Sequence, residues 1–341
     1  MQKTNLKIIA KALGISVATV SKALNNYSDV SKKTKDLVLE LAKKLNYTPN
    51  SFAVNLRTKE SKTIGIIIPT MVHYFFSSII DGILQEAEKR NYMVVLMQSN
   101  EDYELEKKQI DLLLSKGVDG IAISLSNQTK DFKHLQKVIE NDIPLLLFDK
   151  IAKTVKCSKV IIDDRKAAYQ AVSYLINKGH KRIAHFRGDL NPQNSIDRFL
   201  GYKKALQDNA IEYDASLVYL CDTNSAFDDG YVNAKKLVED HGKNVDAIFT
   251  VNDLLAIGAL NYLTEKKIKV PEEIALFGFS NWFMTKITSP TLSSIDQNAY
   301  KMGLKTAEVL LSEIDSKHKG LPIHYQTVII DTELIIREST K

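Results

Sequence analysis

Three apolar runs in this chain end in side chains that can form hydrogen bonds. Asp149 follows PLLLF, Asn252 follows IFTV and Ser280 follows LFGF. Ligands of open α/β sheets bind beyond the carboxyl ends of the strands, so these groups are candidates for binding a small polar molecule. Arg198 adds a planar fork of donors that suits hydroxyls or a carboxylate. Two structural alternatives stay open: Asp149 or Asn252 caps the following helix, and Arg198 pairs with a carboxylate of its own surface.

A second kind of chemistry is indicated by the charge of the N-terminal segment. The net charge of +5 is unevenly distributed: residues 1–62 carry twelve basic and four acidic residues, or +8, and the rest of the chain carries −3. A small basic segment on a mildly acidic body is typical of nucleic-acid binding. The alternative on charge alone is a lysine-rich solvated surface.

The sequence lacks the motifs of common enzyme and cofactor sites. Neither G-x-G-x-x-G nor G-x-x-x-x-G-K-[ST] occurs, and GFSNW begins like a nucleophile elbow without its second glycine. The seven histidines form no pair at i, i+4. Cys157 and Cys221 are far apart, so we expect buried thiols and no disulfide or zinc site. We therefore expect no enzyme, no cofactor and no metal.

The first 49 residues predict three short helices. The first has apolar residues at helical spacing: Leu6, Ile9, Ala10 and Leu13. Thr4 is its candidate N-cap, and Gly14 ends it. Ser16 can cap a second helix, which Asn25 and Asn26 end. Its apolar face is Val20, Ala23 and Leu24, and its outward face is Val17, Ala18, Ser21 and Lys22.

The third predicted helix begins with Ser31 and Thr34. Its apolar stripe is Leu37, Val38, Leu41, Ala42 and Leu45. Helix, glycine-containing turn and second helix with small residues at its start suit the DNA major groove, because only a slim helix end approaches base edges closely. A plain helical hairpin is the alternative.

The stretches KIIAKALGISVATVSKALNN and VSKKTKDLVLELAKKLNYTPN resemble the DNA-binding head of the lactose-repressor (LacI/GalR) family. Matching positions imply base contacts by Val17, Ala18 and Lys22. They imply that a further set holds phosphates or the docking geometry: Asn5, Ser16, Thr19, Ser21, Asn25, Ser31, Thr34 and Tyr47. Because Val17 and Ala18 offer only apolar contacts, the polar reading of bases rests mainly on Lys22.

Residues 50–57, NSFAVNLR, predict a hinge that becomes helical on DNA, since two turns are too short to be stable alone. The family resemblance implies that Leu56 wedges between base pairs in the minor groove, with Asn50 and Ala53 beside it. The alternative is that Leu56 packs on the core.

From residue 62 onward, short apolar runs alternate with helical stretches, which predicts parallel sheets covered by helices on both faces. The expected fold is an all-α helix-turn-helix head followed by an α/β core of two doubly wound lobes, similar to periplasmic binding proteins. The predicted ranges are 1–49 for the head, 50–61 for the hinge, 62–161 with 292–322 for lobe 1, and 162–291 with 323–341 for lobe 2.

The resemblance implies a ligand cleft between the two lobes. Its matching positions are Phe76, Asp149, Asn194, Arg198, Asn252 and Ser280, with His73, Tyr74 and Phe75 near the mouth. Two positions depart from the family. Ser280 stands where the family usually has Asp, so the ligand need not be a common hexose. In TNSAFDDGY, Ser225 replaces the usual cleft aromatic, for which Phe227 could substitute.

These features predict a transcriptional regulator, and a repressor in particular, whose operator affinity changes when a small molecule alters the angle between the lobes. The expected partners are double-stranded pseudo-palindromic operator DNA, a sugar-like effector and a second copy of the chain. A C-terminal heptad tail is missing from the sequence, which argues against a tail-mediated tetramer. A long apolar segment or signal peptide is missing too, so we expect no membrane association and a bacterial cytoplasmic protein, nucleoid-associated when bound.

Two rival functions differ from this prediction in features that can be checked. A sugar-binding protein of a transport system would need a signal peptide and would have no basic head. A DNA-binding protein whose core has lost its ligand would gain no stability from any sugar, nucleoside or base.

Overall fold

The computed structural model describes residues 5–47, 60–72, 74–242 and 244–341. The chain divides into two compact units, Met1–Ser61 and Lys62–Lys341. The whole predicted hinge, residues 50–57 with Asn50, Ala53 and Leu56, lies outside the described residues, as do Thr4 and His73.

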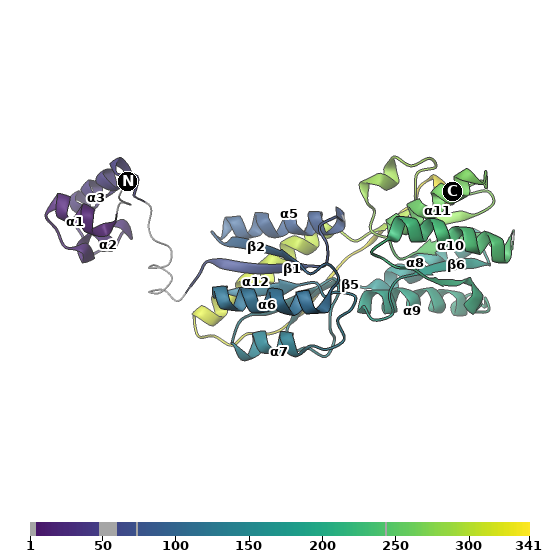
Figure 1. The fold of residues 1–341 in the computed structure, drawn as a ribbon, viewed down its shortest axis with the longest axis horizontal. Helices are drawn as coiled ribbons and strands as arrows, with labels where there is room; N and C mark the ends of the chain where they lie inside the picture. The colour runs from purple at the N-terminus through teal and green to yellow at the C-terminus, as the bar shows by residue number, and fades with distance from the viewer. Residues whose placement is uncertain (1–4, 48–59, 73, 243) are drawn as a thin grey trace. The chain divides into compact units, whose positions relative to one another are not determined.

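The N-terminal unit contains the three predicted helices, labelled in Figure 1: α1 (Leu6–Leu13), α2 (Val17–Leu24) and α3 (Lys32–Lys44). Each begins with a side-chain cap, because the first backbone N–H groups of a helix have no partner within it. Ser16 accepts a hydrogen bond from the Thr19 N–H at 3.0 Å, and Ser31 accepts one from the Thr34 N–H at 3.2 Å. The cap of α1 is Asn5, not Thr4.

A small apolar core joins the three helices. Its buried members are Ile9, Ala10, Val20, Ala23, Val30, Val38 and Ala42. Leu41 and Leu45 pack against this core as predicted, but Leu37 is 47% exposed. The prediction for Leu37 was wrong because Val38 and Leu41 already fill the face of α3 that meets the other helices.

The first lobe of the core contains a parallel sheet in the order β11-β5-β4-β3-β1-β2. Its strands are β1 (Thr63–Ile68), β2 (Met93–Gln98), β3 (Gly120–Ile123), β4 (Leu145–Phe148), β5 (Ser158–Ile162) and β11 (Thr327–Ile330). Its helices are α5 (Tyr74–Lys89), α6 (Tyr103–Lys116), α7 (Lys133–Glu140) and α12 (Ala299–His318). Residues of α5 and α12 pack on one face of this sheet, and those of α6 and α7 pack on the other.

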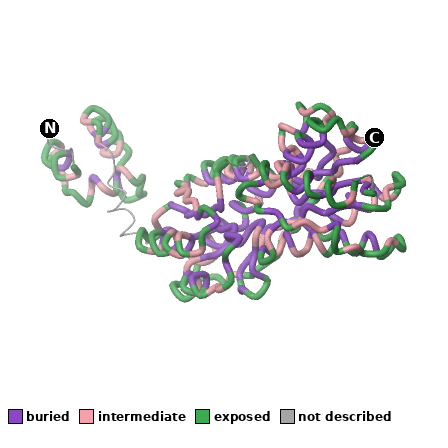
Figure 2. Tube along the Cα trace, turned by 45° about the vertical axis from the view of Figure 1, so that its right-hand side comes forward, coloured by how far each residue is buried: buried purple, intermediate pink, exposed green. Residues whose placement is uncertain are grey.

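Strand β1 shows why both faces need cover, since all six of its residues are buried. Ile66 packs in the cluster that includes Ile79 of α5, and Ile67 packs in the cluster that includes Ile110 of α6. Side chains of a strand alternate between faces, so a continuous apolar run requires helices on both. Figure 2 shows this pattern as buried strands lined by more exposed helices.

The second lobe contains a parallel sheet in the order β7-β6-β8-β9. Its strands are β6 (Ile183–Arg187), β7 (Val218–Leu220), β8 (Ala247–Thr250) and β9 (Ala275–Phe277). Its helices are α8 (Asp164–Asn177), α9 (Gln193–Asp208), α10 (Ala226–His241) and α11 (Asp253–Glu265), with short 3-10 turns at Ala215–Leu217, Phe283–Lys286 and Glu338–Thr340. Residues of α8 and α9 pack on one face, and those of α10 and α11 pack on the other.

The chain passes between the lobes three times. The first passage follows β5, and the other two involve β10 (Ser294–Asp296) and β12 (Glu333–Ile335), which pair antiparallel. Strand β11 pairs with β5 in the first sheet, so the predicted placement of all residues 323–341 in lobe 2 was wrong. The run TVIIDTELII consists of two strands in different sheets, because Asp331 and Thr332 separate them.

Helix α5, which brings three aromatic residues to the cleft, is held close to α12. A Cβ on Gly82 would lie 2.3 Å from the Tyr300 carbonyl oxygen, and one on Gly303 would lie 2.0 Å from the Ile79 carbonyl oxygen. The two glycines therefore allow the helix backbones to touch, which fixes the start of α5.

Candidate ligand cleft and DNA-binding helix

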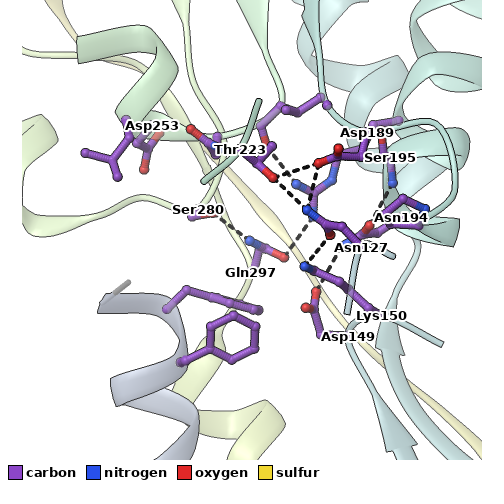
Figure 3. Close-up of a pocket in the computed structure, with 18 of the residues that line it drawn as sticks. Asn127, Asp149, Lys150, Asp189, Asn194, Ser195, Thr223, Asp253, Ser280 and Gln297 are labelled. Atoms are coloured by element: carbon purple, nitrogen blue, oxygen red, sulfur yellow. Dashed lines mark hydrogen bonds between the residues drawn. The ribbon is translucent and has the colours of Figure 1, made fainter. Parts of the chain in front are cut away.

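A pocket with a cavity of about 130 Å³ lies between the lobes, at the carboxyl ends of both parallel sheets (Figure 3). Its lining includes every predicted cleft residue that the structure describes: Tyr74, Phe75, Phe76, Asp149, Asn194, Arg198, Asn252 and Ser280. The structure thus brings together residues that lie up to 206 positions apart, between 74 and 280.

Asp149 lies at the pocket with its carboxylate held by both lobes. It accepts hydrogen bonds from the Ser124 hydroxyl at 3.1 Å and from the Asn194 amide at 3.3 Å, so it does not cap a helix. Burial raises the pKa of Asp149, while Lys150 and Arg198 oppose this effect. Its φ of 54° is uncommon for a residue with a side chain, and such conformations cluster at functional sites.

Arg198 is buried and uses its guanidinium within the protein. Its Nε donates to Asp164 at 2.7 Å and its Nη1 donates to the Val251 carbonyl at 2.7 Å. Its Nη2 donates to Gln297 at 3.3 Å, and its plane lies 3.7 Å from the Phe279 ring centroid. Burial raises the pKa of Asp164 to about 6, although Arg198 acts to lower it. Arg198 therefore pairs with a carboxylate, as the structural alternative predicted. It also lines the pocket.

Ser280 takes part in the same network through Gln297. The Gln297 amide donates to the Ser280 hydroxyl at 2.8 Å while its oxygen accepts from Arg198. Ser280 has a φ of 114°, a conformation that favours glycine. The position where the family usually has Asp thus carries a neutral hydroxyl, bonded to a neutral amide.

Asn252 and Asp253 support the cleft by fixing backbone. The Asn252 side chain accepts from the Leu255 N–H at 2.9 Å, so Asn252 caps α11, as the structural alternative predicted. Asp253 accepts from the Trp282 N–H at 2.7 Å and from the Ser294 hydroxyl at 2.6 Å. Burial raises the pKa of Asp253 to about 6. These bonds position the loop that carries Ser280.

Aromatic side chains from both lobes form an apolar wall. The rings of Phe75 and Phe76 meet edge to face at 5.3 Å, and Tyr74 meets Phe283 across the lobes at 5.8 Å. Trp282 lines the pocket, whereas Phe227 is 41% exposed and is not among the lining residues, so it does not replace the usual cleft aromatic. Trp282 is the aromatic residue that lobe 2 contributes to the pocket lining.

Two buried donors at the pocket, the Trp282 indole N–H and the Ser195 hydroxyl, have no hydrogen-bond partner among the described residues. A buried polar group without a partner is costly, so both suit the recognition of a polar ligand.

Sequence reasoning missed several polar lining residues: Glu101, Asn127, Lys150, Asp189, Thr223 and Gln297. The signal that found Asp149 applies to five of them, because each follows a parallel strand by two to four residues. Gln297 follows β10, which pairs antiparallel, and so gives no such signal.

In the N-terminal unit, the predicted base-contacting residues lie on the exposed face of α2. Val17, Ala18 and Lys22 are exposed, and Lys22 forms an ion pair with Asp29. The side-chain hydrogen bond from Lys22 lowers the pKa of Asp29.

The predicted phosphate-holding residues are mostly occupied in local bonds. Ser16 bonds to Thr19 and Ser31 to Thr34, while Asn25 donates to the Ser21 carbonyl at 2.7 Å. Tyr47 is half-buried against the helix core, and burial raises its pKa.

Within residues 5–47, 60–72, 74–242 and 244–341, no group of three His, Cys, Asp or Glu side chains could hold a metal ion. None of the helices in these ranges has the length and apolar character that a membrane crossing requires. Cys157 and Cys221 are both buried, as predicted.

Comparisons with known proteins agree with this division of the chain. Residues 5–50 match the family model described as bacterial regulatory proteins, lacI family. Residues 61–338 match the model described as periplasmic binding proteins and sugar binding domain of LacI family. The chain belongs to the LacI family of bacterial regulatory proteins.

Relatives of full length support the same assignment. The HTH-type transcriptional repressor PurR of Haemophilus influenzae (strain PittEE) is 31% identical over 340 residues, covering 98% of each chain. The HTH-type transcriptional regulator RegA of Clostridium saccharobutylicum is 32% identical over 338 residues, covering 99% of each chain. A solved complex of the transcriptional regulator CelR with cellobiose has 26% identity and a TM-score of 0.75, covering 98% of this chain and 99% of that one.

The predicted family and fold are therefore confirmed. As a member of this family, the chain is a DNA-binding transcriptional regulator with a core of the kind that binds small-molecule effectors.

Proposed function

We propose that this regulator is a repressor that binds a pseudo-palindromic operator as a homodimer, and that a sugar or sugar derivative in the cleft sets its operator affinity. The observation that carries the proposal is the convergence of polar and aromatic groups from both lobes on one pocket. A ligand that contacts both lobes can alter the angle between them, which is the differential interaction that allosteric control requires.

The chemistry of the pocket favours a sugar. Carboxylate, amide and hydroxyl groups such as those of Asp149, Asn194 and Ser195 suit ring hydroxyls. Trp282 and Phe76 offer flat apolar surface to the apolar face of a sugar ring. The regulator CelR, a similar structure, was solved with cellobiose. In this proposal the cleft binds the effector and catalyses no reaction.

For the DNA-binding unit, we propose that Val17, Ala18 and Lys22 contact bases in the major groove. Lys22 would exchange its exposed partner Asp29 for a base edge, at little cost because exposed ion pairs are weak. Asn5, Ser16, Thr19, Ser21, Asn25, Ser31, Thr34 and Tyr47 would hold the phosphates. Leu56, with Asn50 and Ala53, stays a prediction for the minor groove. A bound dimer would act on the nucleoid in the bacterial cytoplasm.

The test is selection of genomic DNA fragments by the purified chain over a range of salt, with and without a panel of sugars and nucleosides. We expect a pseudo-palindrome whose affinity depends on one member of the panel. Salt-sensitive binding without sequence preference would contradict the operator proposal. Sequence-specific binding together with no thermal stabilisation by any panel member would favour a core that has lost its ligand.

The same assay tests the reading residues. We expect Lys22→Ala to relax base preference at one position by about 5- to 150-fold, because one good base contact contributes about 1–3 kcal/mol. Leu56→Ala should weaken specific binding and leave non-specific binding nearly unchanged. An unchanged preference in Lys22→Ala, or equal losses of both kinds of binding in Leu56→Ala, would contradict these roles.

A further inference from the structure

The loop that follows β3 is fixed from within the first lobe. Glu106 of α6 is fully buried and accepts three hydrogen bonds: from the Ser126 N–H at 2.6 Å, from the Thr129 hydroxyl at 2.8 Å and from His134 Nε2 at 2.7 Å. A buried carboxylate with several partners holds its surroundings rigidly. The backbone on either side of Asn127 is therefore set by lobe 1.

Asn127 extends from this loop to the second lobe. Its side-chain amide donates to Asp189 at 2.7 Å and to the Thr223 hydroxyl oxygen at 2.8 Å, and the Thr223 hydroxyl donates to Asp189 at 2.9 Å. Asp189 follows β6 and Thr223 follows β7, so both belong to lobe 2. The three side chains form a closed cycle across the cleft (Figure 3).

The other end of Asn127 is bound within lobe 1. Its side-chain oxygen accepts from the Lys150 ammonium at 2.5 Å, and its backbone N–H donates to Glu101 at 2.7 Å. Lys150 also pairs with Glu101 at 2.5 Å. We refer to Glu101, Lys150, Asn127, Asp189 and Thr223 as the cross-lobe bridge. Asn127 is the member that contacts all of the other four.

The cross-lobe bridge differs from the exposed contacts between the lobes. Asn127 is only 6% exposed, and the side chains of Lys150 and Glu101 are nearly as buried. The ion pair of Lys153 with Asp197 also joins the lobes, at 3.2 Å, but the Lys153 side chain is largely exposed. Hydrogen bonds shielded from water are costly to leave unmade, whereas exposed ion pairs contribute little.

We propose that Asn127 is the positioning residue that sets the relation of the two lobes, and that the effector acts on that relation through the cross-lobe bridge. All five bridge residues line the pocket, so a ligand there can reach them directly. One oxygen of Asp189 is outside the hydrogen bonds of the bridge, which leaves an acceptor for a ligand hydroxyl. The link from bridge to DNA rests on the proposed function; the link from bridge to lobe geometry does not.

The test reverses the polarity of the bond between the lobes. Asn127→Asp places a carboxylate against Asp189 and removes the donor, whereas Asn127→Asp with Asp189→Asn restores one donor and one acceptor in opposite places. Lobe geometry is read as the distance between spin labels on Gln136→Cys of α7 and Gln207→Cys of α9, both exposed positions. Labelled chain is diluted with unlabelled chain so that distances within one chain dominate, and the native cysteines are buried.

We expect one narrow distance distribution in the otherwise native chain, a broadened or shifted one in Asn127→Asp, and recovery in the double variant. Lys153→Ala, which removes the exposed ion pair, should leave the distribution unchanged. Thr223→Val serves if Asn127→Asp fails to fold, and it should broaden the distribution less. An unaltered distribution in Asn127→Asp or Thr223→Val, or a double variant as altered as Asn127→Asp, would overturn the proposal.

Operator affinity supplies the second readout, measured on the DNA fragment selected by the native chain. We expect Asn127→Asp to change this affinity by at least about 5-fold, within the usual range of allosteric coupling, and the double variant to return within about 2-fold of the native value. A native chain that selects no fragment would contradict the proposed function, while the spin-label distances would still decide the role of Asn127.

Discussion

The N-terminal unit and the ligand cleft both depend on hydrogen bonds from short polar side chains, but the bonds span very different lengths of chain. In the N-terminal unit, Ser16 bonds to Thr19 and Ser31 to Thr34, each three residues away. In the cleft, Asn127 bonds to Thr223, which is 96 residues away, and Arg198 bonds to Gln297, which is 99 residues away.

Because of this difference, the bonds of the N-terminal unit stabilise single helices, whereas the bonds of the cleft depend on how the two lobes are arranged. A helix cap forms whenever its own helix forms, and its loss affects that helix alone. A bond between lobes forms only when both sheets are complete and correctly oriented, so it responds to anything that moves them. The unit that reads DNA can thus stay folded while the cleft changes, which suits a regulator whose signal arises in the core.

The largest effect that the comparison predicts is in Arg198→Met. Removing this buried cation leaves Asp164 without its partner and should destabilise the core by about 3–5 kcal/mol. The measurement is urea unfolding followed by far-UV circular dichroism. Because Asp164 can be neutralised by a proton, the loss should be smaller at pH 5 than at pH 8.

Lys153→Met is the matched control, since it removes a cation from an exposed ion pair between the lobes. Its effect should stay within about 0.5 kcal/mol. Equal losses in the two variants would break the distinction between buried and exposed ion pairs.

Glu313→Gln tests whether a buried long-range polar bond outside the cleft affects only the stability of the chain or also the geometry of the lobes. Glu313 bonds to Ser158 in lobe 1, 155 residues away, and lies outside the pocket. Burial raises the pKa of Glu313 to about 7 from 4.5, so the folded chain retains a proton that the unfolded chain releases. Native stability should therefore fall as the pH rises from about 4.5 to 7.

The amide that replaces this carboxyl cannot titrate, so the variant should not share this loss of stability. Between pH 5 and pH 8, the free energy of unfolding of Glu313→Gln should therefore rise relative to that of the native chain by an amount on the order of 2 kcal/mol. Unfolding midpoints at both pH values measure this gain, and the spin-label distances should not change. A shift in those distances would show that burial outside the cleft also controls the lobes.

The smallest expected effect is in Ser16→Ala, which removes the cap of α2. The cost should be about 1 kcal/mol, or about 5-fold faster amide exchange in the N-terminal unit, with core amides unchanged. Ser28→Ala, at an exposed turn position, is the control. Faster exchange in the core of Ser16→Ala would contradict the local character of the cap.

The same difference explains which parts could be predicted from the sequence. The helices of the N-terminal unit followed from periodicity and caps, although Leu37 was placed in the core because periodicity alone does not show which of two adjacent leucine-rich faces is covered. The alternation of strands and helices predicted the two lobes. Strand β11 was misplaced because its partner β5 lies far away in the sequence.

In the cleft, Asp149 and Ser280 could be predicted because strand ends meet at one edge of a parallel sheet. Which polar groups pair there could not be predicted. Arg198 was expected to face a ligand, and the structure shows three protein acceptors around it. Asn127 lies four residues beyond β3, where a loop of its own, held by Glu106, decides its direction.

The three passages between the lobes also determine the order in which the regulator can fold during synthesis. The N-terminal unit is complete once residue 61 has been made, and its local bonds allow it to fold as it leaves the ribosome. Neither lobe can do so, because the first sheet lacks β11 and the second lacks the turn at Glu338–Thr340 until those two segments are translated. A nascent chain can thus carry a folded N-terminal unit well before it has an effector cleft.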